Sequence, residues 1–269
     1  MAIFLSLIFI IGCLFVLNHY VSEKKKALQE EEKKERERKI AERKAEEEKR
    51  RLEIERQEKE EIDKIEQVPI VIDDSFVITR NKMSEMVLPK FSTITKRTNI
   101  LSVSEFVVID IETTGIAINK SQIIELSAVR FEEFEPVEIF TTLINPKKHI
   151  PEDATEVNNI TDEMVADMPE LRQVVKQFID FVGKSTIIGH NLLFDLRHLY
   201  HYGVDFSSNR KFCTYELAKK AIKNNYIRNY KLTTVCDYLD VTIVDAHRSM
   251  YDCIATGRVF KELCSLIID

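Results

Sequence analysis

The sequence predicts an α/β domain over residues 104–269, behind an apolar segment and a long charged segment. Three runs rich in β-branched and aromatic residues follow one another at 106–111, 123–131 and 137–145, and each is typical of a strand. Later residues alternate helical apolar spacing with one short apolar run at 185–188. This order is typical of α/β proteins, and about 165 residues are enough to bury one core.

The first run ends in two carboxylates and a turn. Side chains alternate between the faces of a strand, so Asp110 and Glu112 point to the same side, separated by roughly 6–7 Å of backbone. Thr113, Thr114 and Gly115 then end the strand, and a glycine lets the backbone turn close to a ligand. The segment is either one wall of an acidic site or a strand that ends in a solvated acidic turn.

A second acidic segment follows the short apolar run, at the start of a helix predicted over 191–202. Its leucines recur at helical spacing, and Asn191 is expected to cap the first turn. Asp195 comes about one turn later, and because helical side chains lean toward the N-terminus, its carboxylate is expected to face the same cleft. The alternative is an exposed carboxylate that pairs with Arg197 or His198.

The third segment runs from His247 to Asp252. Its Ser249-x-x-Asp252 spacing also fits a capping box, in which the acid satisfies backbone donors at a helix start and His247 is only a loop residue. In the functional interpretation, His247 on the loop and Asp252 in the first helical turns converge on the same cleft as the other two segments.

Together the three segments supply four carboxylates and one imidazole. Four carboxylates brought together repel one another unless cations neutralise them. Ligand sets made of oxygen alone suit Mg²⁺ or Mn²⁺, and a nearby imidazole suits a general base. The combination predicts metal-dependent hydrolysis of phosphodiesters.

The three motifs, "DIETTG", "GHNLLFD" and "HRSMYD", resemble those of the DEDDh group of 3′→5′ exonucleases, particularly members similar to the epsilon proofreading subunit of DNA polymerase III. The resemblance covers about residues 104–269 and implies an RNase H-like α/β fold with a mixed sheet flanked by helices. One departure is Cys213-Thr214, where the family often has Asp-Thr.

The resemblance also implies roles for individual residues. Two Mg²⁺ or Mn²⁺ ions would be held by Asp110, Glu112, Asp195 and Asp252. His247 would take a proton from the attacking water, and Glu112 is counted with it as catalytic. The terminal nucleotide would be contacted by Thr113, Thr114, Gly115, Asn191 and Phe194.

The predicted activity is removal of nucleoside 5′-monophosphates from the 3′ end of a nucleic acid, with single-stranded DNA favoured as the substrate. One alternative is an exonuclease that trims RNA. Another is a nuclease-fold domain that has lost catalysis and serves as a scaffold at a membrane, although the complete ligand set argues against it. The sequence names no protein partner.

Charge limits how a nucleic acid is bound. Outside residues 23–66, 23 basic residues face 28 acidic ones, so a generic polyanion-binding surface is not expected and binding should be local. The local candidate is the segment 210–231, in which basic and tyrosine residues alternate as suits single-stranded nucleic acid. Its members are Arg210, Lys211, Tyr215, Lys219, Lys220, Lys223, Tyr226, Arg228, Tyr230 and Lys231. The alternative is a solvated helix face.

The N-terminal segment is almost uninterrupted in apolar residues over 2–21, which is near the length needed to span a bilayer. Three lysines at 24–26 follow it, and the positive-inside rule then places the rest of the chain in the cytoplasm. Residues 1–22 are therefore predicted to be a transmembrane anchor in a single-pass membrane protein, with the membrane as a partner. A signal sequence or an interfacial segment is the alternative.

Residues 23–67 are dominated by Glu, Lys and Arg in nearly equal numbers of each sign, which predicts a solvated helical stalk. A disordered charged tether is the alternative, and the few apolar residues do not hold the heptad seam of a coiled coil. Residues 68–103 contain apolar clusters typical of strands or packing segments, with no assignable role. Cys213, Cys236, Cys253 and Cys264 are predicted to be reduced core thiols.

Overall fold

The computed structural model describes residues 2–268, with the backbone alone at residues 2–18, 20, 21, 27, 28 and 32. The chain divides into two compact units, Met1–Arg56 and Gln57–Asp269.

The N-terminal part of the chain is one long helix, α1 (Ala2–Ile62). Its described side chains are mostly exposed, and many pair across one turn, as Glu30 does with Lys34 at 3.2 Å and Arg38 with Glu42 at 3.2 Å. Such pairs each add a few tenths of a kcal/mol to an exposed helix. Of the two structures predicted for residues 23–67, the helix is therefore the one observed.

The predicted membrane localisation is wrong. Within the described part of the chain, no helix combines the length and the apolarity that crossing a bilayer requires. After residue 21 the described side chains of α1 are dominated by ionised Glu, Lys and Arg, and moving each such group into hydrocarbon is unfavourable by about 3 kcal/mol. Of the segment 2–21, which gave rise to the prediction, only the side chain of His19 lies among those described. The membrane is thus without support as a partner.

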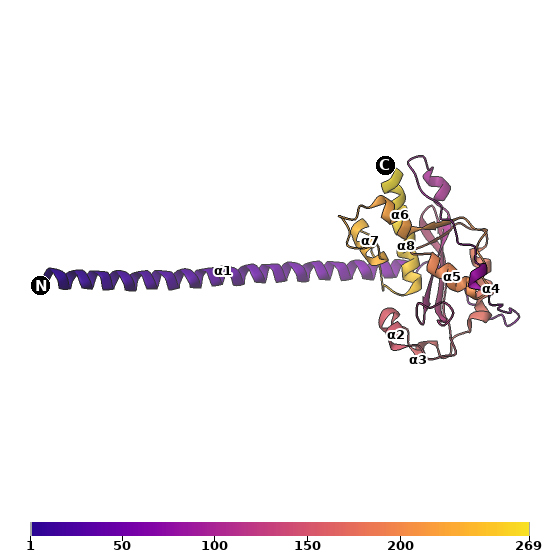
Figure 1. Ribbon diagram of the computed structural model, residues 1–269, viewed down its shortest axis with the longest axis horizontal. Coiled ribbons are helices and arrows are strands. Elements are labelled where there is room, and N and C mark those ends of the chain that lie inside the picture. Colours follow the sequence, from indigo (N-terminus) through magenta and orange to yellow (C-terminus); the bar gives the residue numbers. More distant parts are fainter. Residues whose placement is uncertain (1, 269) are drawn as a thin grey trace. The chain divides into compact units, whose positions relative to one another are not determined.

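The unit Gln57–Asp269 contains a six-stranded mixed sheet in the order β1-β4-β3-β2-β5-β6, which confirms the predicted α/β class (Figure 1). β2 and β4 are antiparallel to β3, whereas β5 is parallel to β2 and β6 is parallel to β5. The strands are β1 (Glu66–Gln67), β2 (Phe106–Thr113), β3 (Ile123–Glu132), β4 (Glu135–Leu143), β5 (Ile187–Gly189) and β6 (Lys211–Cys213). The four strands expected from apolar runs are all present.

Helices cover both faces of the sheet. In Figure 1, α6, α7 and α8 lie on one side of the sheet and α4 and α5 lie on the other. The alternation of β2 explains why, since Phe106 and Val108 join the core beside α8, whereas Val107, Ile109 and Ile111 join the core beside α4 and α5. The helices are α2 (Glu152–Asn158), α3 (Asp162–Val165), α4 (Leu171–Val182), α5 (Leu193–His201), α6 (Thr214–Ala221), α7 (Leu232–Leu239) and α8 (Ser249–Ile268).

The close approach of α8 to the sheet depends on Gly257. A Cβ atom at this position would lie 2.2 Å from Cζ of Phe131 on β3, which is far inside van der Waals contact. The glycine therefore lets the first turns of α8, which carry Asp252, lie directly against the central strands.

Residues 68–103 pack on the domain without adding a strand to the described sheet. They contain only two short 3₁₀ turns, Met83–Glu85 and Ile100–Val103. Backbone N–H groups of Asp73 and Asn81 donate to carbonyls of Gln173 and His201, which ties the segment to α4 and to α5. Of the two structures predicted for this segment, packing is therefore correct and strands are not.

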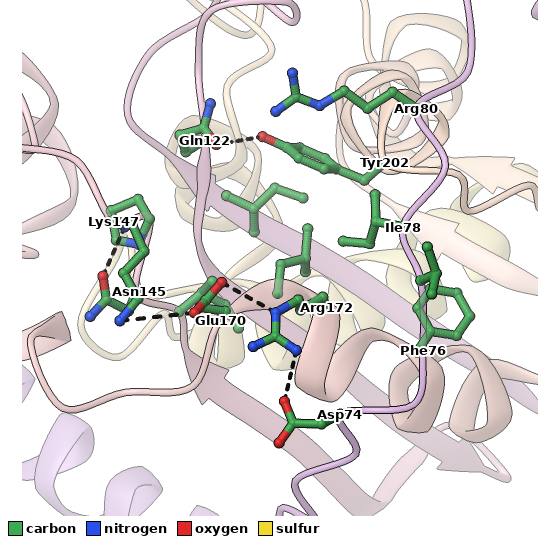
Figure 2. A pocket seen from close by; sticks show the side chains of 15 residues that line it. Asp74, Phe76, Ile78, Arg80, Gln122, Asn145, Lys147, Glu170, Arg172 and Tyr202 are labelled. Carbon is green, nitrogen blue, oxygen red and sulfur yellow. Dashed lines mark hydrogen bonds and ion pairs between the residues drawn. The ribbon is translucent and has the colours of Figure 1, made fainter.

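This segment also forms one wall of a 470 Å³ cavity at the edge of α4 (Figure 2). Phe76 and Ile78 lie at the apolar side of the cavity, and Arg172 bridges Asp74 and Glu170 at its rim. None of the described residues predicted to form the catalytic or substrate site lines this cavity.

Candidate metal centre

Three carboxylates converge where β2 meets the start of α8. Asp110 and Glu112 project from the same face of β2, and Asp252 comes from the first turn of α8. One oxygen from each can be chosen so that all three lie within 4.8 Å of one another. The spacing of two on the strand and the contact of α8 with the sheet therefore produce a compact cluster of oxygen donors that is poised to bind a metal ion.

Asp195 lies beside this cluster but is not part of the described three-carboxylate group. Its side chain is only 2% exposed, and its Oδ1 accepts a hydrogen bond from the backbone N–H of Ile111 at 3.2 Å. Ile111 separates the two carboxylates of β2, so this bond holds Asp195 against the same stretch of strand. The alternative of an exposed helix carboxylate paired with a neighbouring cation is therefore wrong.

Asn191 does not cap α5, contrary to the prediction. The helix begins at Leu193 after the backbone cap Leu192, with no hydrogen bond from a capping side chain. Asn191 itself has φ 58°, in the left-handed region, where asparagine is one of the few residues tolerated. The sharp turn that this φ produces sends the chain from β5 into α5 and places Asp195 within reach of β2.

Burial raises the pKa of all four carboxylates, and repulsion from neighbouring carboxylates adds to the shift of Asp110, Glu112 and Asp252. Burial raises the pKa of Glu112 to about 8, and the charges on Asp252 and Glu125 add to the shift. Burial also raises the pKa of Asp195 to about 8, that of Asp252 to about 7, and that of Asp110 well above its ordinary value. A divalent cation fits this set, because oxygen donors are the ligands that hard dications prefer and the positive charge removes the repulsion.

These pKa values predict how pH affects metal binding and stability. Between about pH 4 and about pH 8 the folded apo protein binds more protons than the unfolded chain, so its stability should fall as pH rises through this window. Because a dication competes with those protons, the increase in melting temperature on replacing EDTA with Mn²⁺ should be larger at about pH 8 than at about pH 6. An equal or smaller increase at the higher pH would contradict the assignment.

His247 lies on the loop before α8, exposed and with φ 68°. Its backbone N–H donates to Oδ1 of Asp252 at 3.4 Å, and both residues line a 380 Å³ cavity. The structure therefore brings His247 and one carboxylate of the cluster, Asp252, to the same cavity.

The capping-box alternative for this segment does not hold. The hydroxyl of Ser249 shares a 2.6 Å hydrogen bond with the hydroxyl of Ser127 on β3. The backbone N–H of Ser249 donates instead to Oε2 of Glu125 at 2.8 Å. A carboxylate from β3, and not one from the helix itself, thus satisfies this donor at the start of α8.

Glu125 is the main residue of the site that the sequence did not reveal. It stands opposite Glu112 in the register of β2 and β3, is 2% exposed, and accepts from Nη2 of Arg248 at 2.7 Å. Asn158 was missed as well: its side-chain amide donates a hydrogen bond to Glu112, which lowers the pKa of Glu112 and so opposes the rise caused by burial. Glu125 is the one acidic residue in the apolar run 123–131, and this was the signal in the sequence that could have pointed to a role for it.

The predicted substrate contacts fall into two groups. At the end of β2, the hydroxyl of Thr113 donates to the carbonyl of Gly115 at 2.7 Å, and that of Thr114 accepts from the N–H of Gln122 at 2.9 Å. Gly115 has φ 152°, so this turn favours glycine. At the start of α5, Asn191 is exposed and Phe194 is half-buried. Both groups lie next to residues of the acidic site along the chain.

The basic segment 210–231 does not form one surface. Lys211 is 4% exposed and its ammonium donates to the carbonyls of Ser207 and Asn209, so it is a buried structural residue, contrary to the prediction. Lys219 pairs with Glu216. By contrast, Arg228 and Lys231 line the cavity that contains His247. The four cysteines predicted to be reduced core thiols are all buried and free of disulfides.

Comparison with known proteins gives the family. The family model described as Exonuclease, RNase T, matches residues 107–260. The chain belongs to this exonuclease family. The exonuclease match begins within β2, ends within α8 and so includes all four carboxylates and His247. Members of the family use divalent metal ions, in agreement with the oxygen-donor cluster.

Individual relatives agree with this membership. The exonuclease domain is 31% identical over 171 residues to DNA polymerase III subunit epsilon of Aquifex aeolicus. This alignment covers 62% of this chain and 83% of that protein. It is 34% identical over 168 residues to the PolC-type DNA polymerase III of Oceanobacillus iheyensis, covering 61% of this chain but only 12% of that protein. The chain thus spans about an eighth of the length of such PolC-type relatives.

The fold also matches a solved nuclease. The structure of E. coli exonuclease I in complex with a dT13 oligonucleotide superimposes with a TM-score of 0.51 at 18% identity, over 61% of this chain and 41% of that chain. At this identity the likeness shows the fold alone, and it confirms the RNase H-like exonuclease architecture expected from the motifs.

Proposed function

We propose that the protein is a metal-dependent 3′→5′ exonuclease that releases nucleoside 5′-monophosphates, with DNA as the favoured substrate. The observation that carries this proposal is the convergence of Asp110, Glu112 and Asp252 within 4.8 Å, with Asp252 lining the same cavity as His247. We assign the activity to residues 104–269, with 23–67 as a stalk and 68–103 as a connecting region.

The geometry supports the following ligand roles. Asp110, Glu112 and Asp252 would hold divalent cations, and Asp195, held by the N–H of Ile111, would complete the set. When bound, two Mg²⁺ or Mn²⁺ ions stabilise the charge that develops on the attacking and leaving oxygens of an in-line displacement. In their absence the pKa values of Glu112 and Asp252 are raised, to about 8 and about 7, so bound cations would compete with protons for these carboxylates.

We assign the role of general base to His247. It is exposed at the mouth of the site, so its ring can reach a water molecule, while its backbone is tied to Asp252. The water would lose a proton to the imidazole as its oxygen attacks phosphorus. The bond from phosphorus to the 3′ oxygen of the preceding nucleotide would break, and that oxygen would keep the electron pair and take a proton from solvent. Thr113, Thr114, Gly115, Asn191 and Phe194 flank the acidic residues and are proposed to hold the terminal nucleotide.

The choice of DNA is supported by the relatives. One is a subunit of a DNA polymerase, and a structural neighbour is described in complex with a deoxyoligonucleotide. RNA trimming is the second candidate, and a scaffold without catalysis is the third. The retention of all four carboxylates and His247 disfavours the third candidate, because loss of catalysis removes the pressure to keep them.

One assay separates these candidates. Labelled single-stranded DNA, duplex DNA and RNA are each incubated with the purified protein in Mn²⁺ or in EDTA. Single-stranded DNA should be degraded fastest in Mn²⁺ and not at all in EDTA. Faster degradation of RNA would favour the second candidate, and no degradation of any substrate in Mn²⁺ would overturn the proposed function.

A further inference from the structure

The imidazole of His247 has no partner of its own to hold it in place. Among the described residues it makes no hydrogen bond and no ion pair, and the backbone N–H of His247 makes the one bond to Asp252. The residue also lies outside α8, which begins at Ser249. A general base is commonly oriented by a third group that bonds to its ring. The position of this imidazole therefore depends on the backbone that carries it.

A buried carboxylate on β3 holds the two residues that follow His247. Oε1 of Glu125 accepts from Nε and Nη2 of Arg248 at 3.1 and 2.7 Å. Oε2 of Glu125 accepts from the backbone N–H of Ser249 at 2.8 Å. The side chains of Glu125 and Arg248 are 3% and 28% exposed, so salt and water weaken this charge-assisted contact less than they would on the surface.

The strand that carries Glu125 also carries a second contact to the same junction. The hydroxyl of Ser127, two residues further along β3, shares a hydrogen bond of 2.6 Å with the hydroxyl of Ser249. Glu125 itself stands opposite Glu112 in the register of β2 and β3. Two residues of β3 thus fix the chain just after His247 to the strand beside one of the cluster carboxylates.

We propose that Glu125 is a positioning residue for catalysis, which acts by keeping the imidazole of His247 at a fixed place relative to the metal cluster. The proposal rests on the proposed function. Glu125 is assigned this role and not that of a metal ligand, because both of its oxygens are already held by donors from Arg248 and Ser249. Asp252 depends less on this contact, since the buried apolar residues of α8 pack the helix on the sheet.

Two substitutions with opposite effects on charge test the proposal. Glu125→Gln removes a negative charge beside the cluster and Arg248→Gln removes a positive one, so an effect of charge on the bound cations would have opposite signs in the two variants. Positioning predicts that both variants lower kcat on single-stranded DNA by about 10- to 100-fold at saturating Mn²⁺, because a displacement of about 1 Å can cost on the order of 10² in rate. KM should change by less than about threefold in both. Opposite changes in kcat would overturn the proposal.

The His247→Ala variant provides the second measurement. If Glu125 acts through the imidazole, adding Glu125→Gln to His247→Ala should lower kcat by less than about a further threefold. A further loss as large as the one that Glu125→Gln causes on its own would show a role independent of His247 and would overturn the proposal.

Glu138→Gln is the matched control for the loss of an ion pair in the same sheet. Glu138 on β4 pairs with Arg130 on β3 at 2.9 Å, and Arg130 stands opposite Val107, at the end of β2 far from Glu112. This variant should keep the kcat of the wild type.

Two further outcomes would overturn the positioning role while leaving the nuclease assignment intact. One is a loss of kcat in Glu138→Gln as large as that in Glu125→Gln, and the other is an unchanged kcat in both Glu125→Gln and Arg248→Gln. If the wild-type protein does not hydrolyse DNA in Mn²⁺, the proposed function itself fails.

Discussion

Asp110→Asn should lower turnover on single-stranded DNA by about a thousandfold or more, a loss of roughly 4 kcal/mol of transition-state stabilisation. The amide cannot replace an anionic ligand at this position. Asp110 lies close enough to Asp195, Asp252 and Glu112 for their charges to raise its pKa. The initial rate of DNA degradation in Mn²⁺ measures the effect.

The same substitution should not harm the fold. Because Asp110 is half-buried and repelled by its neighbours, removing its charge should leave the melting temperature in EDTA equal to or above that of the wild type at about pH 8. Asp167→Asn, at an exposed carboxylate, is the control and should change neither quantity. Near-wild-type activity in the folded Asp110→Asn variant would show that the carboxylate is not a metal ligand.

His247→Ala should lower kcat by about 10²- to 10⁴-fold and change KM by less than about threefold. The imidazole is proposed to move a proton in the transition state, and it is not proposed to hold the substrate in the ground state. Steady-state kinetics on a short single-stranded substrate separate the two constants.

The control for this variant is His201→Gln, a histidine at the end of α5. It should retain wild-type kinetics. A rise in KM that accounts for the whole loss in the His247→Ala variant would make His247 a binding residue and not a base.

The parts of the site that were predictable are those encoded over short distances. The alternation of β2 alone places Asp110 and Glu112 on one face, and the helix after β5 brings Asp195 to the same end. Motif order then connects these segments with His247 and Asp252. Local geometry and a familiar set of motifs were sufficient to predict that these carboxylates lie close together.

The residues that were missed act across long separations. Glu125 and Arg248 are 123 residues apart, and only the approach of α8 to β3 shows that the acid holds the start of the helix. Lys211 was predicted to belong to a basic surface, because nothing in the sequence shows that its ammonium donates to the carbonyls of Ser207 and Asn209. Both the position of Glu125 at the start of α8 and the burial of Lys211 result from tertiary packing.

The N-terminus illustrates the limit of composition. Apolar length and flanking lysines predicted a membrane span over 2–21, yet no helix among the described residues is long and apolar enough to cross a bilayer. The charged segment that follows formed the helix expected from its i,i+4 pairs.

The most direct test of the central claim is the polarity of degradation. A single-stranded DNA labelled at its 5′ end is incubated with the protein in Mn²⁺, and the products are resolved over time beside the same strand blocked by a 3′-terminal phosphorothioate. The acidic cluster acting as proposed predicts a ladder that shortens one nucleotide at a time from the 3′ end, with nucleoside 5′-monophosphates released and the blocked strand degraded far more slowly. Internal cuts, shortening from the 5′ end, or the same ladder in EDTA would contradict the proposed function.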